Sequence, residues 1–199
     1  MHPWRERLTR WFTPLARRCP LSPNAVTILA LILNLCAAAL LSRALFLWAI
    51  VLIAAGGLAD AFDGIVARAQ ARETRFGDFL DHFADRVSDA ALTACWLIGS
   101  QVRESLVVAG VIAVMLNGYL GTQIEATFHQ RNYESVGRGE FVLALIVFPI
   151  ASSILFRNGW SSLALAGMTI AEWLALLLIA FALFGIVQRL ALARRLERS

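Results

Sequence analysis

Long apolar stretches without charge dominate the hydrophobic pattern of this chain. No Asp, Glu, Lys or Arg occurs at positions 24–42, 44–59, 105–124 or 141–156. At a rise of about 1.5 Å per residue, about 20 helical residues cross the hydrocarbon core of a bilayer. Because lipid offers no partners to exposed backbone groups, such stretches cross a membrane as helices. The pattern therefore predicts an all-α integral membrane protein.

The same pattern predicts six transmembrane helices in a single catalytic domain over residues 21–199. Their expected ranges are 24–42, 46–69, 78–100, 104–128, 138–157 and 163–190. No composition shift or internal repeat marks a second domain. Any site must therefore lie within these helices or in the loops that connect them.

Residues 1–20 are predicted to form a separate juxtamembrane segment. Its apolar residues that recur at near-helical spacing among arginines are Trp4, Leu8, Trp11, Phe12 and Leu15. This spacing is typical of an amphipathic helix that lies on the membrane surface. A disordered basic tail would carry the same charge and is the alternative.

The arginines indicate which ends of the helices face the cytoplasm. All 18 basic residues are arginines, and all but Arg43, Arg103 and Arg157 fall on one side of the predicted helices. Since the cytoplasmic loops of membrane proteins carry the excess of positive charge, we expect both termini in the cytoplasm and the protein in the cell (inner) membrane. The net charge of +4 has no nucleic-acid-binding motif beside it, so no nucleic-acid partner is expected.

Four aspartates lie where the second predicted helix leaves the membrane and the third enters it. They are Asp60, Asp63, Asp81 and Asp85. At about 100° per residue, the first two share one stripe of their helix, and the last two lie one turn apart on the next helix. Because the connection is short and antiparallel, the two stripes should face each other. Carboxylates inside a membrane protein are costly and by default indicate function.

Four converging carboxylates would repel one another strongly without cations. Hard oxygen ligands without histidine or thiolate favour Mg²⁺ or Mn²⁺ over zinc. Four aspartates can hold two such ions, which suits the displacement of a phosphoryl group. In the alternative interpretation, the aspartates are solvated beyond the helix ends. They would then pair with neighbouring arginines, namely Arg68, Arg72, Arg75 and Arg86.

Small residues and one arginine accompany these aspartates. Gly64 and Ala67 lack bulk, so a ligand can approach the helix backbone there. Arg68 follows directly and can hold a diphosphate with its planar guanidinium. The stretch therefore combines a cation site with a candidate diphosphate site.

Residues 60–85 match the pattern Asp-x2-Asp-Gly-x2-Ala-Arg-x8-Gly-x3-Asp-x3-Asp without a mismatch. This pattern resembles the signature of the CDP-alcohol phosphotransferases, also called CDP-alcohol phosphatidyltransferases. The resemblance implies a divalent-metal enzyme of phospholipid synthesis, often homodimeric. Such an enzyme transfers the substituted phosphate of CDP-diacylglycerol, or of another CDP-alcohol, to an alcohol acceptor and releases CMP.

The resemblance also implies roles for individual residues. The four aspartates correspond to metal ligands, and Asp85 corresponds in addition to the general base. The implied donor contacts within the signature are Gly64, Ala67, Arg68, Thr74 and Gly77. A second motif at 23–27 resembles one that opens the first helix and borders the donor site, which adds Asn24 and Thr27. The stretch at 22–24 is equally an ordinary helix start.

The acceptor alcohol stays open at this stage. Phosphorylated acceptors such as glycerol phosphate or inositol phosphate need a cationic pocket, for which Arg131 and Arg138 are candidates. The same two arginines are equally well explained as loop charges that mark topology. His82 is expected to face differently from Asp81 and to have a structural role.

Two other kinds of membrane protein also place carboxylates between helices. Intramembrane prenyltransferases use aspartate pairs with magnesium to bind diphosphates, but their motifs lack the Gly-x2-Ala-Arg segment. Transporters bind cation cargo with such carboxylates, although they usually show internal repeats and sites at the midplane of the membrane. These aspartates instead cluster near one surface, which favours the transferase.

Overall fold

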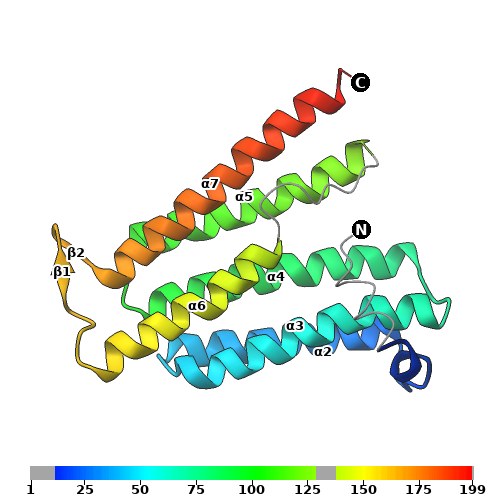
Figure 1. The fold of residues 1–199 in the computed structure, drawn as a ribbon, viewed down its shortest axis with the longest axis horizontal. Coiled ribbons are helices and arrows are strands. Elements are labelled where there is room, and N and C mark those ends of the chain that lie inside the picture. The colour runs from blue at the N-terminus through cyan, green and yellow to red at the C-terminus, as the bar shows by residue number, and fades with distance from the viewer. Residues whose placement is uncertain (1–11, 129–137, 199) are drawn as a thin grey trace.

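The computed structural model describes residues 12–128 and 138–198 and is built mainly from long helices (Figure 1). The helices are α2 (Pro23–Ser42), α3 (Phe46–Ala69), α4 (Arg75–Gly99), α5 (Glu104–Phe128), α6 (Arg138–Arg157) and α7 (Ile170–Leu196). Two short strands, β1 (Ala164–Leu165) and β2 (Met168–Thr169), pair antiparallel before α7. Residues 12–17 form a short helix ahead of α2.

Four of these helices, α2, α3, α5 and α7, are long and apolar enough to cross a membrane. The first fifteen residues of α4 include Asp78, Asp81, Asp85, Arg86 and Asp89, and this charge lowers the hydropathy of the helix. In α6 the apolar part is the shorter stretch Leu143–Arg157. The structure is therefore that of a membrane protein, whereas the six-span topology stays a prediction.

The predicted boundaries agree with the observed ones for the first five long helices to within three residues. The last boundary is wrong, because α7 begins at Ile170 instead of 163 and continues to Leu196. A hairpin occupies the preceding residues, with Ala166 at φ 52° and Gly167 at φ 76°. The Thr169 hydroxyl then accepts a hydrogen bond from the Glu172 amide at 3.2 Å, which starts the helix there.

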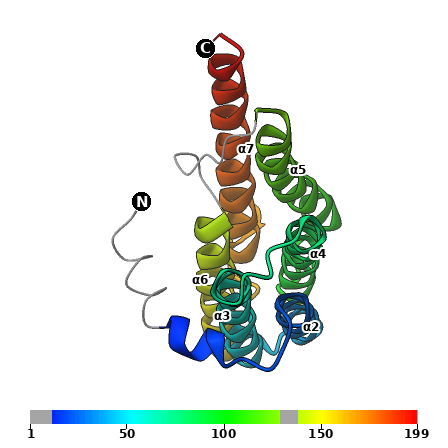
Figure 2. The same ribbon diagram turned by 90° about the vertical axis from the view of Figure 1, so that its right-hand side faces the viewer.

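Helix α2 packs against both α3 and α4, and α4 in turn contacts α5 extensively and α6 to a smaller extent (Figure 2). The fully buried Trp96 of α4 donates a hydrogen bond from Nε1 to Ser152 Oγ of α6 at 3.0 Å. The backbones of α2 and α4 meet where Gly99 lies against the carbonyl oxygen of Leu41, and a Cβ at position 99 would overlap that oxygen. A glycine is required at this contact because the two backbones touch.

One end of the molecule carries the hairpin and the other carries the α3–α4 connection together with the C-terminal end of α7 (Figure 1). At the hairpin end, Arg103 donates hydrogen bonds to both carboxylate oxygens of Glu172, and the bond from Nη2 to Oε2 measures 3.2 Å. This contact raises the pKa of the Arg103 guanidinium. Arg43, Arg103 and Arg157 all follow or end helices at this end.

The predicted surface helix falls only partly within the described residues, because 1–11 lie outside them. In the described part, Ala16 is buried against Ile65 and Val66 of α3, with Phe12 packed beside them. The Gln70 side chain donates hydrogen bonds to the carbonyl oxygens of Ala16 and of Cys19, each at 3.0 Å. Residues 12–19 are therefore attached to the end of α3 that carries the aspartates.

Candidate active site

A tight connection joins α3 to α4 at the aspartate end, and α2 packs against both helices. Helix α3 ends at Ala69, and Ala71 at φ 51° turns the chain. The Thr74 hydroxyl then caps α4 by accepting a hydrogen bond from the Gly77 amide at 3.0 Å. This cap starts α4 at Arg75, about one turn earlier than the apolar pattern predicts.

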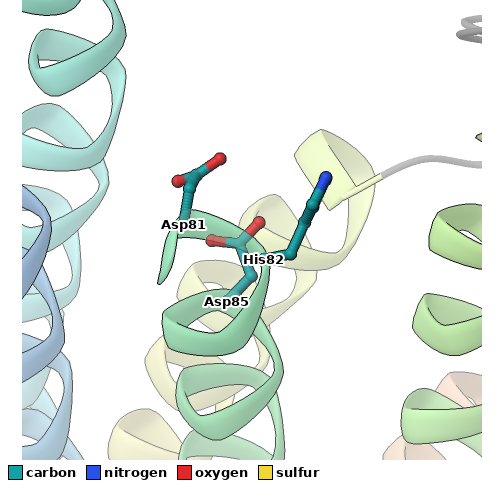
Figure 3. A group of neighbouring side chains, drawn as sticks. All are labelled: Asp81, His82 and Asp85. Atoms are coloured by element: carbon teal, nitrogen blue, oxygen red, sulfur yellow. The ribbon is translucent and has the colours of Figure 1, made fainter. Parts of the chain in front are cut away.

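The four predicted aspartates come together in two overlapping groups. Oxygen atoms of Asp60, Asp63 and Asp81 all lie within 4.8 Å of one another. Asp81 also belongs to the second group, in which its ligand atom lies within 4.8 Å of those of His82 and Asp85. Figure 3 shows this second group on adjoining positions of α4. Asp81 therefore links the carboxylates of α3 to Asp85.

The site suits hard divalent cations by its donor chemistry. Asp63 and Asp85 are each 7 % exposed, while Asp60 and Asp81 are half-buried. Carboxylates so close together and so poorly solvated repel one another unless positive charge lies between them. All four offer oxygen, as Mg²⁺ and Mn²⁺ require. The aspartates therefore fit the predicted ions.

His82 is closer to the carboxylates than the sequence suggests. Helical spacing predicts that it faces differently from Asp81, and one ring nitrogen lies within 4.8 Å of ligand oxygens of both Asp81 and Asp85. Its Nε2 also lies 4.0 Å from Asp78 Oδ2. Figure 3 shows the His82 and Asp81 side chains pointing in different directions, and the long imidazole still brings one nitrogen near the carboxylates.

The predicted donor residues fall into two places beside the aspartates. Arg68 is exposed, and its Nη1 lies 3.4 Å from where a Cβ on Gly64 would be. Asn24 Oδ1 and Thr74 Oγ1 each lie 3.1 Å from where a Cβ on Gly77 would be. The start of α2 therefore adjoins the start of α4, and a larger side chain at position 77 would crowd both polar groups.

The ordinary helix-start interpretation of 22–24 is also confirmed. Ser22 caps α2 by accepting a hydrogen bond from the Ala25 amide at 3.2 Å, with Pro23 in the first turn. Thr27, one turn further, donates a hydrogen bond to Asp63 Oδ2 at 2.7 Å. The same motif therefore caps α2 and contacts the aspartate site.

Ala67, the remaining predicted donor residue, is half-buried beside Arg68.

The side chains of the two arginines predicted for the acceptor lie outside the described residues. Arg131 lies outside the described residues, and Arg138 begins α6 with a side chain that is also outside them.

Two other arginines, for which no acceptor role was expected, meet one face of α5. Arg86 lies against Gly118, and Arg189 lies against Gly121, one turn further along that helix.

Both of these arginines are held by polar partners. Arg86 Nη2 lies 3.2 Å from Asp89 Oδ2. Arg189 is only 8 % exposed and donates a hydrogen bond from Nη1 to Asn117 Oδ1 at 2.6 Å. An arginine inside an otherwise apolar helix is itself a signal of function. The sequence alone shows that Arg189 lies in an apolar helix, but it does not show that the side chain of Arg189 contacts α5.

Comparison with known proteins gives consistent similarities over most of the chain. The archaetidylinositol phosphate synthase of Methanothermobacter thermautotrophicus is 28% identical over 96% of this chain and 92% of its own length. The phosphatidylinositol phosphate synthase of Mycolicibacterium smegmatis is 30% identical over 78% of this chain and 73% of its own length.

Two solved structures of the Mycobacterium tuberculosis phosphatidylinositol phosphate synthase are also similar. The complex with manganese and citrate has a TM-score of 0.70 and 27% identity, covering 91% of this chain and 88% of that one. The structure with CDP-DAG bound has a TM-score of 0.70 and 26% identity, covering 92% and 94%. The CDP-alcohol phosphatidyltransferase family model matches residues 20–184, and with the aspartate signature intact this chain belongs to that family.

Proposed function

We propose that this protein transfers the phosphatidyl group of CDP-diacylglycerol to an inositol phosphate and releases CMP. The observation that carries the proposal is the convergence of Asp60, Asp63 and Asp81 with Asp85 at the junction of α3 and α4. Family membership supports the reaction class and favours it over a prenyltransferase or a transporter. The names of similar proteins and the CDP-DAG in one similar structure support the choice of acceptor and donor.

The four aspartates would hold two divalent cations, Mg²⁺ or Mn²⁺. A similar structure that contains manganese supports this assignment. When bound, such ions offset the negative charge of a diphosphate and of a departing phosphate. The protein's own part is to hold the carboxylates together from two helices before any ligand arrives.

Asp85 is the proposed general base. Its carboxylate would take the proton from the acceptor hydroxyl, and the acceptor oxygen would form a bond to the phosphorus that carries the diacylglycerol. The bond from that phosphorus to the CMP oxygen breaks, and CMP leaves with the electron pair. Arg68, exposed beside Gly64, can offset the charge on the nucleotide phosphate. Burial of Asp85 shields this transfer from water.

For the acceptor phosphate, we place the contact at the glycine face of α5. Arg86 directly follows the proposed base in the chain and contacts α5 at Gly118. Arg189 of α7 contacts α5 at Gly121, about one helical turn further along. An arginine guanidinium binds phosphate with two parallel hydrogen bonds. The arginine distribution further favours a site at the cytoplasmic face of the inner membrane.

The reaction is tested by supplying purified protein with CDP-diacylglycerol, Mn²⁺ and one acceptor at a time. The acceptors are inositol phosphate, glycerol phosphate, inositol and serine. CMP is measured by chromatography, and the lipid product is measured by mass. We expect rapid CMP release and a phosphatidylinositol phosphate only with inositol phosphate. No CMP release with any acceptor would contradict the reaction, and release with glycerol phosphate alone would contradict the acceptor.

Replacing Arg189 by glutamine should raise KM for inositol phosphate by about tenfold or more, because one charged phosphate contact is worth about 1.5–3 kcal/mol. KM for CDP-diacylglycerol should change little. The matched control is Arg194→Gln, since Arg194 is exposed near the end of the same helix. An unchanged KM for inositol phosphate in the Arg189 variant would remove Arg189 from the acceptor site.

A further inference from the structure

We propose that Thr27 is a positioning residue that holds the Asp63 carboxylate in place for cation binding. This inference rests on the proposed metal-dependent function and deepens it. The sequence motif suggested instead that Thr27 contacts the CDP donor. The contacts of its hydroxyl argue for the aspartate.

The Thr27 hydroxyl has one proton and two nearby acceptors. Its Oγ1 lies 2.7 Å from Asp63 Oδ2 and 3.2 Å from the carbonyl oxygen of Pro23. In a regular helix that carbonyl already accepts the backbone N–H of residue 27. The shorter distance is typical of a hydroxyl that donates to a charged carboxylate. The proton therefore belongs on the bond to Asp63.

Both partners in this hydrogen bond are buried. Thr27 is 4 % exposed and Asp63 is 7 % exposed, so neither has much surface left for solvent or a nucleotide. A hydrogen bond to one carboxylate oxygen fixes the rotation of the carboxylate about its last bond. Asp63 can then keep a lone pair directed at the oxygens of Asp60 and Asp81, which lie within 4.8 Å of its ligand atom.

Helix α2, which carries Thr27, is also hydrogen-bonded to α4, the helix that carries Asp81 and Asp85. Asn34, two turns beyond Thr27 on the same face of α2, donates a hydrogen bond to Ser88 Oγ of α4 at 3.2 Å. The Asn34 side chain also lies against Gly56 of α3. Because α2 is fixed to both neighbours, the Thr27 hydroxyl is a rigid reference point for Asp63.

The test measures Mn²⁺ binding to the full-length protein in detergent, by the electron paramagnetic resonance signal of free Mn²⁺, without nucleotide. Thr27→Val removes the hydroxyl and keeps the shape, and Thr27→Ala removes it with less bulk should valine prevent folding. Loss of a hydrogen bond to a metal ligand typically weakens metal affinity about 10–100-fold. We expect that loss in both variants and near-wild-type affinity in Thr27→Ser.

The matched control is Thr93→Val on α4. Thr93 is fully buried, and the structure shows no hydrogen-bond partner for its hydroxyl among the described residues. This variant makes the same chemical change in the apolar core and should keep the wild-type Mn²⁺ affinity. A comparable loss of affinity in Thr93→Val would mean that any loss of a buried hydroxyl loosens the helix packing and weakens Mn²⁺ binding. That result would overturn the proposal.

Kinetics with CDP-diacylglycerol separate positioning from donor contact. Raising Mn²⁺ should restore much of the rate of Thr27→Val, with an unchanged KM for the donor. A raised donor KM at saturating Mn²⁺, together with unchanged Mn²⁺ affinity, would overturn the proposal in favour of a donor contact. The wild type could instead bind Mn²⁺ more tightly than the Thr27 variants and yet release no CMP. That result would refute the proposed function alone. Absence of Mn²⁺ binding by the wild type would refute both.

Discussion

Replacement of Asp85 by asparagine should lower kcat by about 10²–10⁴-fold, the usual contribution of a general base. Asparagine keeps the shape and one oxygen of the side chain but cannot accept the acceptor's proton. The other three aspartates and Arg68 remain, so CDP-diacylglycerol should still bind. The measurements are the steady-state rate of CMP release and the binding of radiolabelled donor.

The control for this variant is Asp78→Asn. Asp78 lies on the same helix, is exposed, and is 4.0 Å from His82. It has no place in the proposed chemistry, so its substitution should leave the rate near that of the wild type. Normal turnover by the Asp85 variant would show that another group accepts the proton.

Replacement of Gly99 by alanine should destabilise the fold by about 3 kcal/mol, the upper range for overpacking. The added Cβ would overlap the carbonyl oxygen of Leu41, which belongs to the backbone and cannot rotate away. The ends of α2 and α4 must then separate. The measurement is the unfolding midpoint in detergent, by circular dichroism or by titration with a denaturing detergent.

Gly57→Ala is the matched control, because nothing lies within 4 Å of a Cβ at that position. Gly57 is inside α3, where glycine costs about 0.5–1 kcal/mol relative to alanine. This variant should therefore be as stable as the wild type or slightly more so. Equal destabilisation of the two variants would show that the contact between Gly99 and Leu41 is not a constraint.

These two predictions separate the chemistry from its scaffold. Asp85→Asn should lower kcat without changing the unfolding midpoint. Gly99→Ala should lower the unfolding midpoint through a contact that lies far from the aspartates. Thr27 belongs between these cases, because it is a scaffold residue whose hydroxyl reaches a proposed metal ligand. Its substitution should change metal affinity more than stability.

The amino-acid sequence by itself determined the helices and the reaction class. Uncharged runs of helical length predict where α2, α3 and α5 lie, because apolar side chains and paired backbone groups are what a bilayer requires. The aspartate signature predicts the cluster, because three- and four-residue spacings place side chains on one helix face. Both signals are local in the chain.

Only the tertiary structure decided which residues meet across helices. The bond from Thr27 to Asp63, the approach of Arg189 to α5 and the sharing of Asp81 between two groups each join residues from different helices. Helical periodicity predicts the face a residue occupies, but not the rotation or offset of the neighbouring helix. Those depend on packing at small residues, as where Gly99 meets Leu41. The hairpin before α7 escaped prediction because its turn depends on backbone angles that apolar spacing does not report.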